Sequence, residues 1–108
     1  MTITDTEELL TRRKRLRVSE HALREAHKEG LRGKDILYAI FNGQIIEHYP
    51  ERDRVLIAGP VVEHPLPVHV VCDYADTAEI VAVTVYIPNR PRWITNQVRG
   101  LIPHPLSA

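Results

Sequence analysis

Residues 43–59, with the sequence GQIIEHYPERDRVLIAG, contain the change from a helical to a strand-like hydrophobic pattern. Before Gly43, the apolar residues between positions 36 and 41 recur at the three- and four-residue spacing of one helix face. From 45 to 49 the side chains alternate, as they do on the two faces of a strand, which puts Ile45, Glu47 and Tyr49 on one face and Ile46 and His48 on the other. The turn residues at 50–53 lead into a second strand, so this stretch predicts a helix followed by a hairpin.

Three helices are predicted before the hairpin. A capping-box pattern begins the first, over about residues 5–15, which has acids in its first turn and a basic run at its end. Ser19 is the N-cap of the second helix, which Gly30 terminates. The third covers about residues 34–42.

Four strands are predicted, over residues 45–49, 54–58, 68–74 and 80–87. The connections between successive strands are short, which favours an antiparallel meander. The expected fold class is therefore α+β, with three N-terminal helices packed on one face of a four-stranded antiparallel sheet.

The composition indicates one domain over residues 1–108, because no break in composition divides the chain. We expect an N-terminal helix at 1–16, a core at 17–88 and an extended C-terminal tail at 89–108. Fourteen basic and fourteen acidic residues give no formal net charge, so only a local patch could attract a nucleic acid. The single Cys72 and the absence of a long apolar run predict a cytoplasmic protein that does not enter a membrane.

A polar cluster is predicted on the exposed side of the sheet. If the apolar faces of the third and fourth strands meet the helices, His69 and Tyr86 both point outward. Glu47 or His48 from the first strand, and Arg54 at the start of the second, could complete the cluster; outside such a cluster, His48 is expected to face solvent. Such residues suit acid–base work on a polar substrate, with arginine holding a phosphate. His69 and Tyr86 also fit a purely structural role on a sheet surface.

His21, at the start of the second helix, is a further candidate base, with helix capping or packing as its alternative role. The basic run at 12–17 could contact a phosphate backbone or an acidic protein, or could simply be a solvated helix end. The spacing of His64 and His69 does not match a zinc site, and no nucleotide-binding or nucleophile motif is present. We therefore expect no metal and no cofactor.

A series of short motifs runs in a fixed order along the chain. They are His21-Ala22, Gly30, Ile36, Gly43, Ile45-Ile46-Glu47, Tyr49-Pro50, Arg54, Leu56, Gly59, Val68-His69-Val70-Val71 and Thr84-Val85-Tyr86-Ile87-Pro88. In this order they resemble the bacterial family labelled domain of unknown function 4258, over about residues 17–99. The chain departs from the family pattern at Glu25 and Glu29, where relatives usually carry arginines.

The resemblance implies a toxin-like domain similar to the RelE and BrnT group, which are compact α+β ribonucleases of toxin–antitoxin pairs. It implies a metal-independent endoribonuclease whose partners are RNA and a cognate antitoxin. In that function His21 or His69 would be the base or acid and Tyr86 a polar donor, while Arg54 and Arg99 would clamp the phosphate. The competing hypothesis is a non-catalytic module that binds a partner protein through a sheet edge or the basic first helix.

Overall fold

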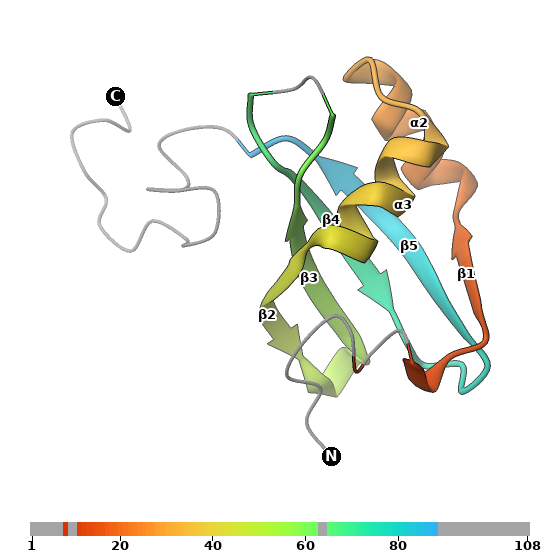
Figure 1. Cartoon of the computed structure of the whole chain (residues 1–108). Helices are drawn as coiled ribbons and strands as arrows, with labels where there is room; N and C mark the ends of the chain where they lie inside the picture. The colour runs from red at the N-terminus through yellow and green to blue at the C-terminus, as the bar shows by residue number, and fades with distance from the viewer. Residues whose placement is uncertain (1–7, 9–10, 63–64, 89–108) are drawn as a thin grey trace.

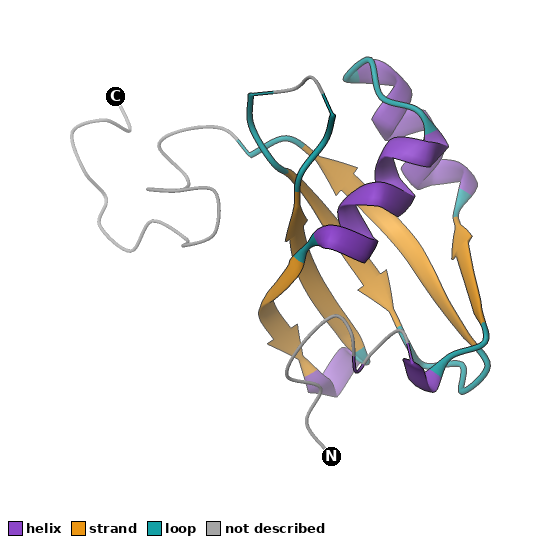
Figure 2. Ribbon diagram, viewed as in Figure 1, coloured by secondary structure: helices purple, strands orange, loops and turns teal. Residues whose placement is uncertain are grey.

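The chain folds as two helices on one face of a five-stranded sheet, within the residues that the computed structural model describes, namely 8, 11–62 and 65–88 (Figures 1 and 2). In chain order the elements are β1 (Arg15–Val18), α2 (Glu20–Lys28), α3 (Gly33–Asn42), β2 (Gln44–Tyr49), the 3₁₀ turn η1 (Pro50–Arg52), β3 (Arg54–Gly59), β4 (Val68–Asp73) and β5 (Glu79–Tyr86). The strand order across the sheet is β1-β5-β4-β3-β2. Strands β2 to β5 pair as an antiparallel meander, whereas β1 pairs with β5 in parallel.

The prediction of three helices on a four-stranded antiparallel sheet is wrong. Residues 15–18, placed at the end of the first helix and the start of the core, form the edge strand β1 and make the sheet mixed. The physical reason is the alternation in Arg15-Leu16-Arg17-Val18, which turns Leu16 and Val18 towards the core. The rest of the predicted first helix lies partly outside the described residues, as does the whole predicted tail at 89–108.

The remaining elements agree with the sequence to within two residues. Helix α2 begins as predicted, because the Ser19 hydroxyl accepts a hydrogen bond from the Ala22 amide at 3.0 Å. Gly30, with a φ of +78°, lies two residues beyond the helix, where a left-handed residue ends the turn. Local sequence signals therefore place these elements correctly, while the long-range pairing of β1 escapes them.

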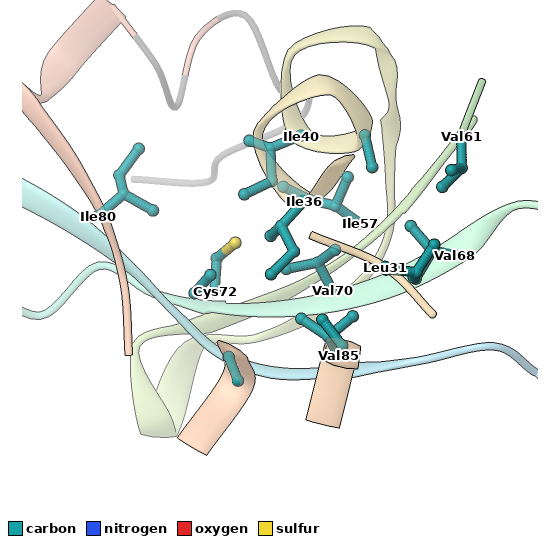
Figure 3. Packing of buried hydrophobic residues seen from close by; sticks show 14 of the residues in the cluster. Leu31, Ile36, Ile40, Ile57, Val61, Val68, Val70, Cys72, Ile80 and Val85 are labelled. Atoms are coloured by element: carbon teal, nitrogen blue, oxygen red, sulfur yellow. The ribbon is translucent and has the colours of Figure 1, made fainter. Parts of the chain in front are cut away.

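The core fills the space between the helices and the sheet. Figure 3 shows Ile36 and Ile40 of α3 pointing at Ile57 and Val70 of the sheet, all without exposed surface. Close approach of α3 to β3 is possible because Gly59 has no side chain: a Cβ there would lie 2.0 Å from the carbonyl oxygen of Ala39. The helices therefore cover one sheet face tightly, and the other face is left to carry polar residues.

Two β-bulges change the faces that simple alternation predicts. In β2, Ile45 pairs with Ile57 but Glu47 pairs with Leu56, so Ile46 is the extra residue. Cross-strand partners share a face, so His48, opposite Val55, turns to the helix-bearing side. The prediction that Ile45 and Glu47 share one face of this strand is therefore wrong.

A second register shift falls between the β4–β5 pairs Val71↔Thr84 and Cys72↔Ala82, and it leaves Val83 as the extra residue. Ala82 consequently faces the core, whereas Thr84 faces away from the helices. Strict alternation along residues 80–87 would put Ala82 and Thr84 on one face, and this bulge separates them.

Candidate functional site

The helix-free face of the sheet brings His69 and Tyr86 together. They are cross-strand partners of β4 and β5, and their rings meet edge to face with centroids 5.3 Å apart. The pair faces away from the helices, as expected from the sequence. His69, however, has no exposed surface, whereas Tyr86 is half-buried. A substrate in solvent would therefore reach Tyr86 and not the imidazole of His69.

Glu47 and Arg54 lie on the same face but in other contacts. Glu47 accepts a hydrogen bond from the Tyr49 hydroxyl. The Arg54 Nε atom is 3.2 Å from Asp73 Oδ2, so its charge is matched by a neighbouring carboxylate. Arg54 is four residues along β3 from Ala58, the partner of His69, which is about 13 Å at the rise of a strand. The described contacts thus give pairs spread over the face, not one convergent cluster.

The middle of this face is also closed to solvent. Leu56 and Ala58, which point to the same side as His69, are 2% and 1% exposed. A ligand on this face would therefore meet the polar groups of the rim.

His21 lies in a different layer, on α2. Its side chain is 61% exposed, and its Nε2 atom is 3.3 Å from Glu25 Oε2. The other oxygen of Glu25 accepts a hydrogen bond from the Val85 amide of β5 at 3.0 Å. Glu25 thus ties α2 to the sheet. Arg99, the last predicted site residue, lies outside the described residues.

A cluster of His48, Tyr74 and Arg13 escaped the sequence reasoning. The Nε2 atom of His48 is 2.6 Å from the Tyr74 hydroxyl, and the Arg13 guanidinium carbon lies 5.8 Å from the centre of the tyrosine ring. An Arg13 nitrogen also donates to the Tyr74 carbonyl oxygen at 2.8 Å. All three side chains are half-buried, so the cluster is accessible to solvent.

This cluster depends on two long-range features of the fold. The bulge at Ile46 turns His48 to the helix-bearing side, at the end of the sheet where η1 connects β2 to β3 (Figure 1). The amides of Lys14 and Arg15 donate to the carbonyl of Ala78, which holds Arg13 near Tyr74. The available sequence signal was the pair Ile45-Ile46, two adjacent apolar residues where strict alternation allows one.

The electrostatics of the cluster keep the tyrosine protonated. Burial raises the pKa of the Tyr74 hydroxyl above its usual value of 10.0, and the carboxylate of Asp53 raises that pKa further, against the opposing effect of Arg13. At neutral pH Tyr74 is therefore a neutral hydroxyl that can donate to His48.

The described part of the chain contains neither a metal-binding group nor a membrane-spanning helix. Within residues 8, 11–62 and 65–88 no group of three or more His, Cys, Asp or Glu side chains is placed to hold a metal ion. In the same residues no helix has the length and apolar character needed to cross a membrane.

Comparison with known proteins identifies the family. The search of curated proteins and the search of solved structures each found no match. Residues 18–87, more than half of the chain, match the family described as domain of unknown function (DUF4258). Strand β1 lies almost entirely before this match, whereas both helices and β2 to β5 lie within it. The chain therefore belongs to the family of the domain of unknown function DUF4258.

Proposed function

We propose that this protein binds RNA and cleaves it without a metal ion, at the cluster of His48, Tyr74 and Arg13. The observation that carries the proposal is the 2.6 Å contact between His48 Nε2 and the Tyr74 hydroxyl, beside the Arg13 guanidinium. A titratable imidazole, a protonated phenol and a fixed cation are together the groups that this reaction requires. The proposal includes a toxin-like role in which a cognate antitoxin protein is the partner.

The reaction would be attack of a ribose 2′-hydroxyl on the adjacent phosphorus. The Tyr74 oxygen would take the 2′ proton as its own proton passes to His48 Nε2. A bond then forms from the 2′ oxygen to phosphorus, and the bond from phosphorus to the 5′ oxygen breaks. The imidazolium returns the proton through Tyr74 to the departing 5′ oxygen, so the pair ends as it began. Arg13 would stabilise the additional negative charge on the phosphate oxygens.

Local charge supports RNA as the substrate although the whole chain is neutral. Residues 12–17 contain five cations, and Arg13 of the cluster is one of them. Two carboxylates face them: Glu8 is 3.2 Å from Arg12, and Glu79 contacts both Arg15 and Arg17. Because the carboxylates of Asp53, Glu51 and Asp73 act on Tyr74 itself, the surplus of positive charge lies along residues 12–17, and it favours a phosphate backbone there.

The test is cleavage of a single-stranded RNA by the purified chain in the presence of a metal chelator. His48→Gln and Tyr74→Phe should each lower the cleavage rate by about 100-fold or more, because acid–base catalysis contributes at least that much. Urea unfolding of each variant checks that the fold is retained.

His69→Gln and Tyr86→Phe form the matched pair on the opposite face of the sheet. If the proposal is right, they cleave at nearly the wild-type rate. If only these two variants lose activity, the active site lies at the predicted residues His69 and Tyr86 and not at the cluster. If the RNA stays intact with the wild type and with every variant, the proposed ribonuclease function is wrong.

The second candidate function is a non-catalytic module that binds a partner protein. Within the described residues β2 ends the sheet and pairs with β3 alone, so its outer edge offers backbone groups for an added strand. A wild-type chain that neither binds nor cleaves RNA, yet forms a stoichiometric complex with a co-expressed antitoxin-like protein, would favour this candidate.

A further inference from the structure

We propose that a hollow beside Arg13 binds one nucleotide, with its phosphate at Arg13 and Lys14 and its base on the ring of Phe41. The hollow, called here the basic hollow, is lined by Arg13, Lys14, Arg15, Leu16, Phe41 and Ile80. The inference deepens the proposed function, on which it rests for the choice of RNA, because Arg13 belongs to both sites. Its own evidence is separate and consists of shape, charge and one unsatisfied donor.

The shape of the basic hollow suits a small amphipathic ligand. Leu16 and Ile80 are partners in the parallel pairing of β1 with β5 and give it an apolar floor. Phe41, at the end of α3, forms its wall and is 60% exposed, an unusual state for a large apolar side chain. The volume of about 240 Å³ lies just below the range of about 300–1,000 Å³ for drug-sized ligands, so one nucleotide fits with its base at the rim.

The charge of the basic hollow is of one sign. Three of its six lining residues are cations and none is acidic. Lys14 makes no ion pair within the part of the chain that the structure describes, whereas the Arg15 guanidinium is 3.8 Å from Glu79. A larger hollow near the start of α3 differs in this respect, because Glu29 and Asp35 line it together with cations. An anion is therefore favoured at the basic hollow and not at the larger one.

One donor of Arg13, a residue that lines the basic hollow, is unsatisfied. The Nε atom of Arg13 is buried and finds no hydrogen-bond acceptor among the described residues, although the guanidinium donates elsewhere to the Tyr74 carbonyl. A buried donor without an acceptor is costly, and a phosphate oxygen is an acceptor that arginine binds well. The exposed Phe41 ring then offers a stacking surface that every base can use. A nucleotide has both a phosphate and an aromatic base, so it matches these two features better than an acidic peptide does.

The experiment titrates the full chain with adenosine 3′-monophosphate, inorganic phosphate and adenosine, following amide chemical shifts by NMR. We expect saturable binding of the nucleotide, with shifts at residues 13–16 and at Phe41. Lys14→Gln should weaken binding of both phosphate-containing probes. Phe41→Ser should weaken nucleotide binding about tenfold, the equivalent of one stacked base, and leave inorganic phosphate unaffected.

Two control variants lie elsewhere on the surface. Lys34→Gln removes an exposed cation that lines the larger hollow, and Tyr38→Ser removes an aromatic ring one turn before Phe41 that does not line the basic hollow. Both should bind as the wild type does. Absence of nucleotide binding by the wild type, or equal losses in a control and its test variant, would overturn the inference.

The failure of the two proposals can be told apart. If the chain binds the nucleotide but cleaves no RNA, the basic hollow is supported as a nucleotide site and the ribonuclease function is rejected. Cleavage that survives Lys14→Gln and Phe41→Ser, without nucleotide binding in this hollow, would do the reverse.

Discussion

Cys72 is a residue whose chemistry is set by its place in the sheet. It lies in β4 on the helix-bearing face, and Figure 3 shows its sulfur pointing into the core. Burial raises the pKa of its thiol from 9.0 to about 12, and the neighbouring Asp73 carboxylate adds to the rise. A raised pKa in the folded state means that the folded chain keeps a proton that the unfolded chain releases. The stability from this residue is therefore complete below pH 9 and falls as the pH rises from 9 towards 12.

The Cys72→Ala variant should remove this pH dependence. Between pH 8 and pH 10 the free energy of unfolding of the wild type should fall by about 1.4 kcal/mol more than that of the variant, because one further group ionises only in the unfolded chain. Urea unfolding of both proteins at pH 8, 9 and 10 measures the difference. Tyr74 titrates in the same direction in both proteins and so cancels in the comparison. Parallel curves for the two proteins would show that the thiol is not protected from ionisation.

Residue-level prediction from the sequence succeeds where alternation is unbroken and fails at bulges. The apolar face of β4 correctly turns His69 outward, and its pairing with Tyr86 follows from the β4–β5 hairpin. Its complete burial could not be predicted, because exposure depends on neighbours from several elements. His48 was expected to face solvent, but one extra residue in β2 turns it towards Tyr74. A bulge turns every later side chain of the strand to the opposite face, and the hydrophobic periodicity does not show where a bulge lies. The sequence pattern therefore could not predict this cluster.

At the scale of elements, the sequence predicts local structure and misses pairing between distant segments. Helices α2 and α3 and strands β2 to β5 follow from caps, turns and periodicity. Strand β1 has only four residues, and its arginines equally suit the end of a helix. What makes it a strand is parallel pairing with β5 and the contact of Arg17 with Glu79, 62 residues later in the chain. No local pattern reports such a contact.

The contact of α2 with β5 gives a prediction for Glu25. Glu25→Ala leaves the Val85 amide without its acceptor and should lower the free energy of unfolding by about 1–3 kcal/mol. Glu25→Gln keeps an acceptor oxygen and should lose less than half as much. Urea unfolding measures these changes, and hydrogen exchange should show faster exchange of the Val85 amide in the Ala variant.

His21→Ala is the control for this contact. It removes the exposed imidazole that contacts Glu25 and leaves the Val85 hydrogen bond, so it should cost no more than about 0.5 kcal/mol. Equal losses in His21→Ala and Glu25→Ala, with unchanged exchange at Val85, would mean that the carboxylate does not hold the helix to the sheet.

For the whole molecule, the distribution of charge matters more than its sum. The chain is neutral, yet five of its fourteen basic residues lie between 12 and 17. The fold gathers them along β1 and the segment before it, at one edge of the sheet (Figure 1). Glu8 and Glu79 offset two of the five charges, which leaves a surplus of about three along this edge. Binding of RNA at this edge therefore releases few counterions compared with a strongly basic protein.

This surplus predicts a shallow salt dependence of RNA binding. With about three phosphates neutralised, the logarithm of the binding constant for a single strand should fall with a slope of about −2 against the logarithm of the salt concentration. Affinity should thus drop about 15-fold between 50 and 200 mM salt. Fluorescence anisotropy with a labelled single-stranded RNA measures the slope. Lys14→Gln removes one contact and should make it shallower by about 0.7, whereas Lys34→Gln, outside the basic edge, should leave it unchanged. A slope near zero, or the same change with both lysines, would mean that this edge does not bind the backbone. The wild-type slope thus reports how many phosphates the neutral chain contacts, and the two variants report where it contacts them.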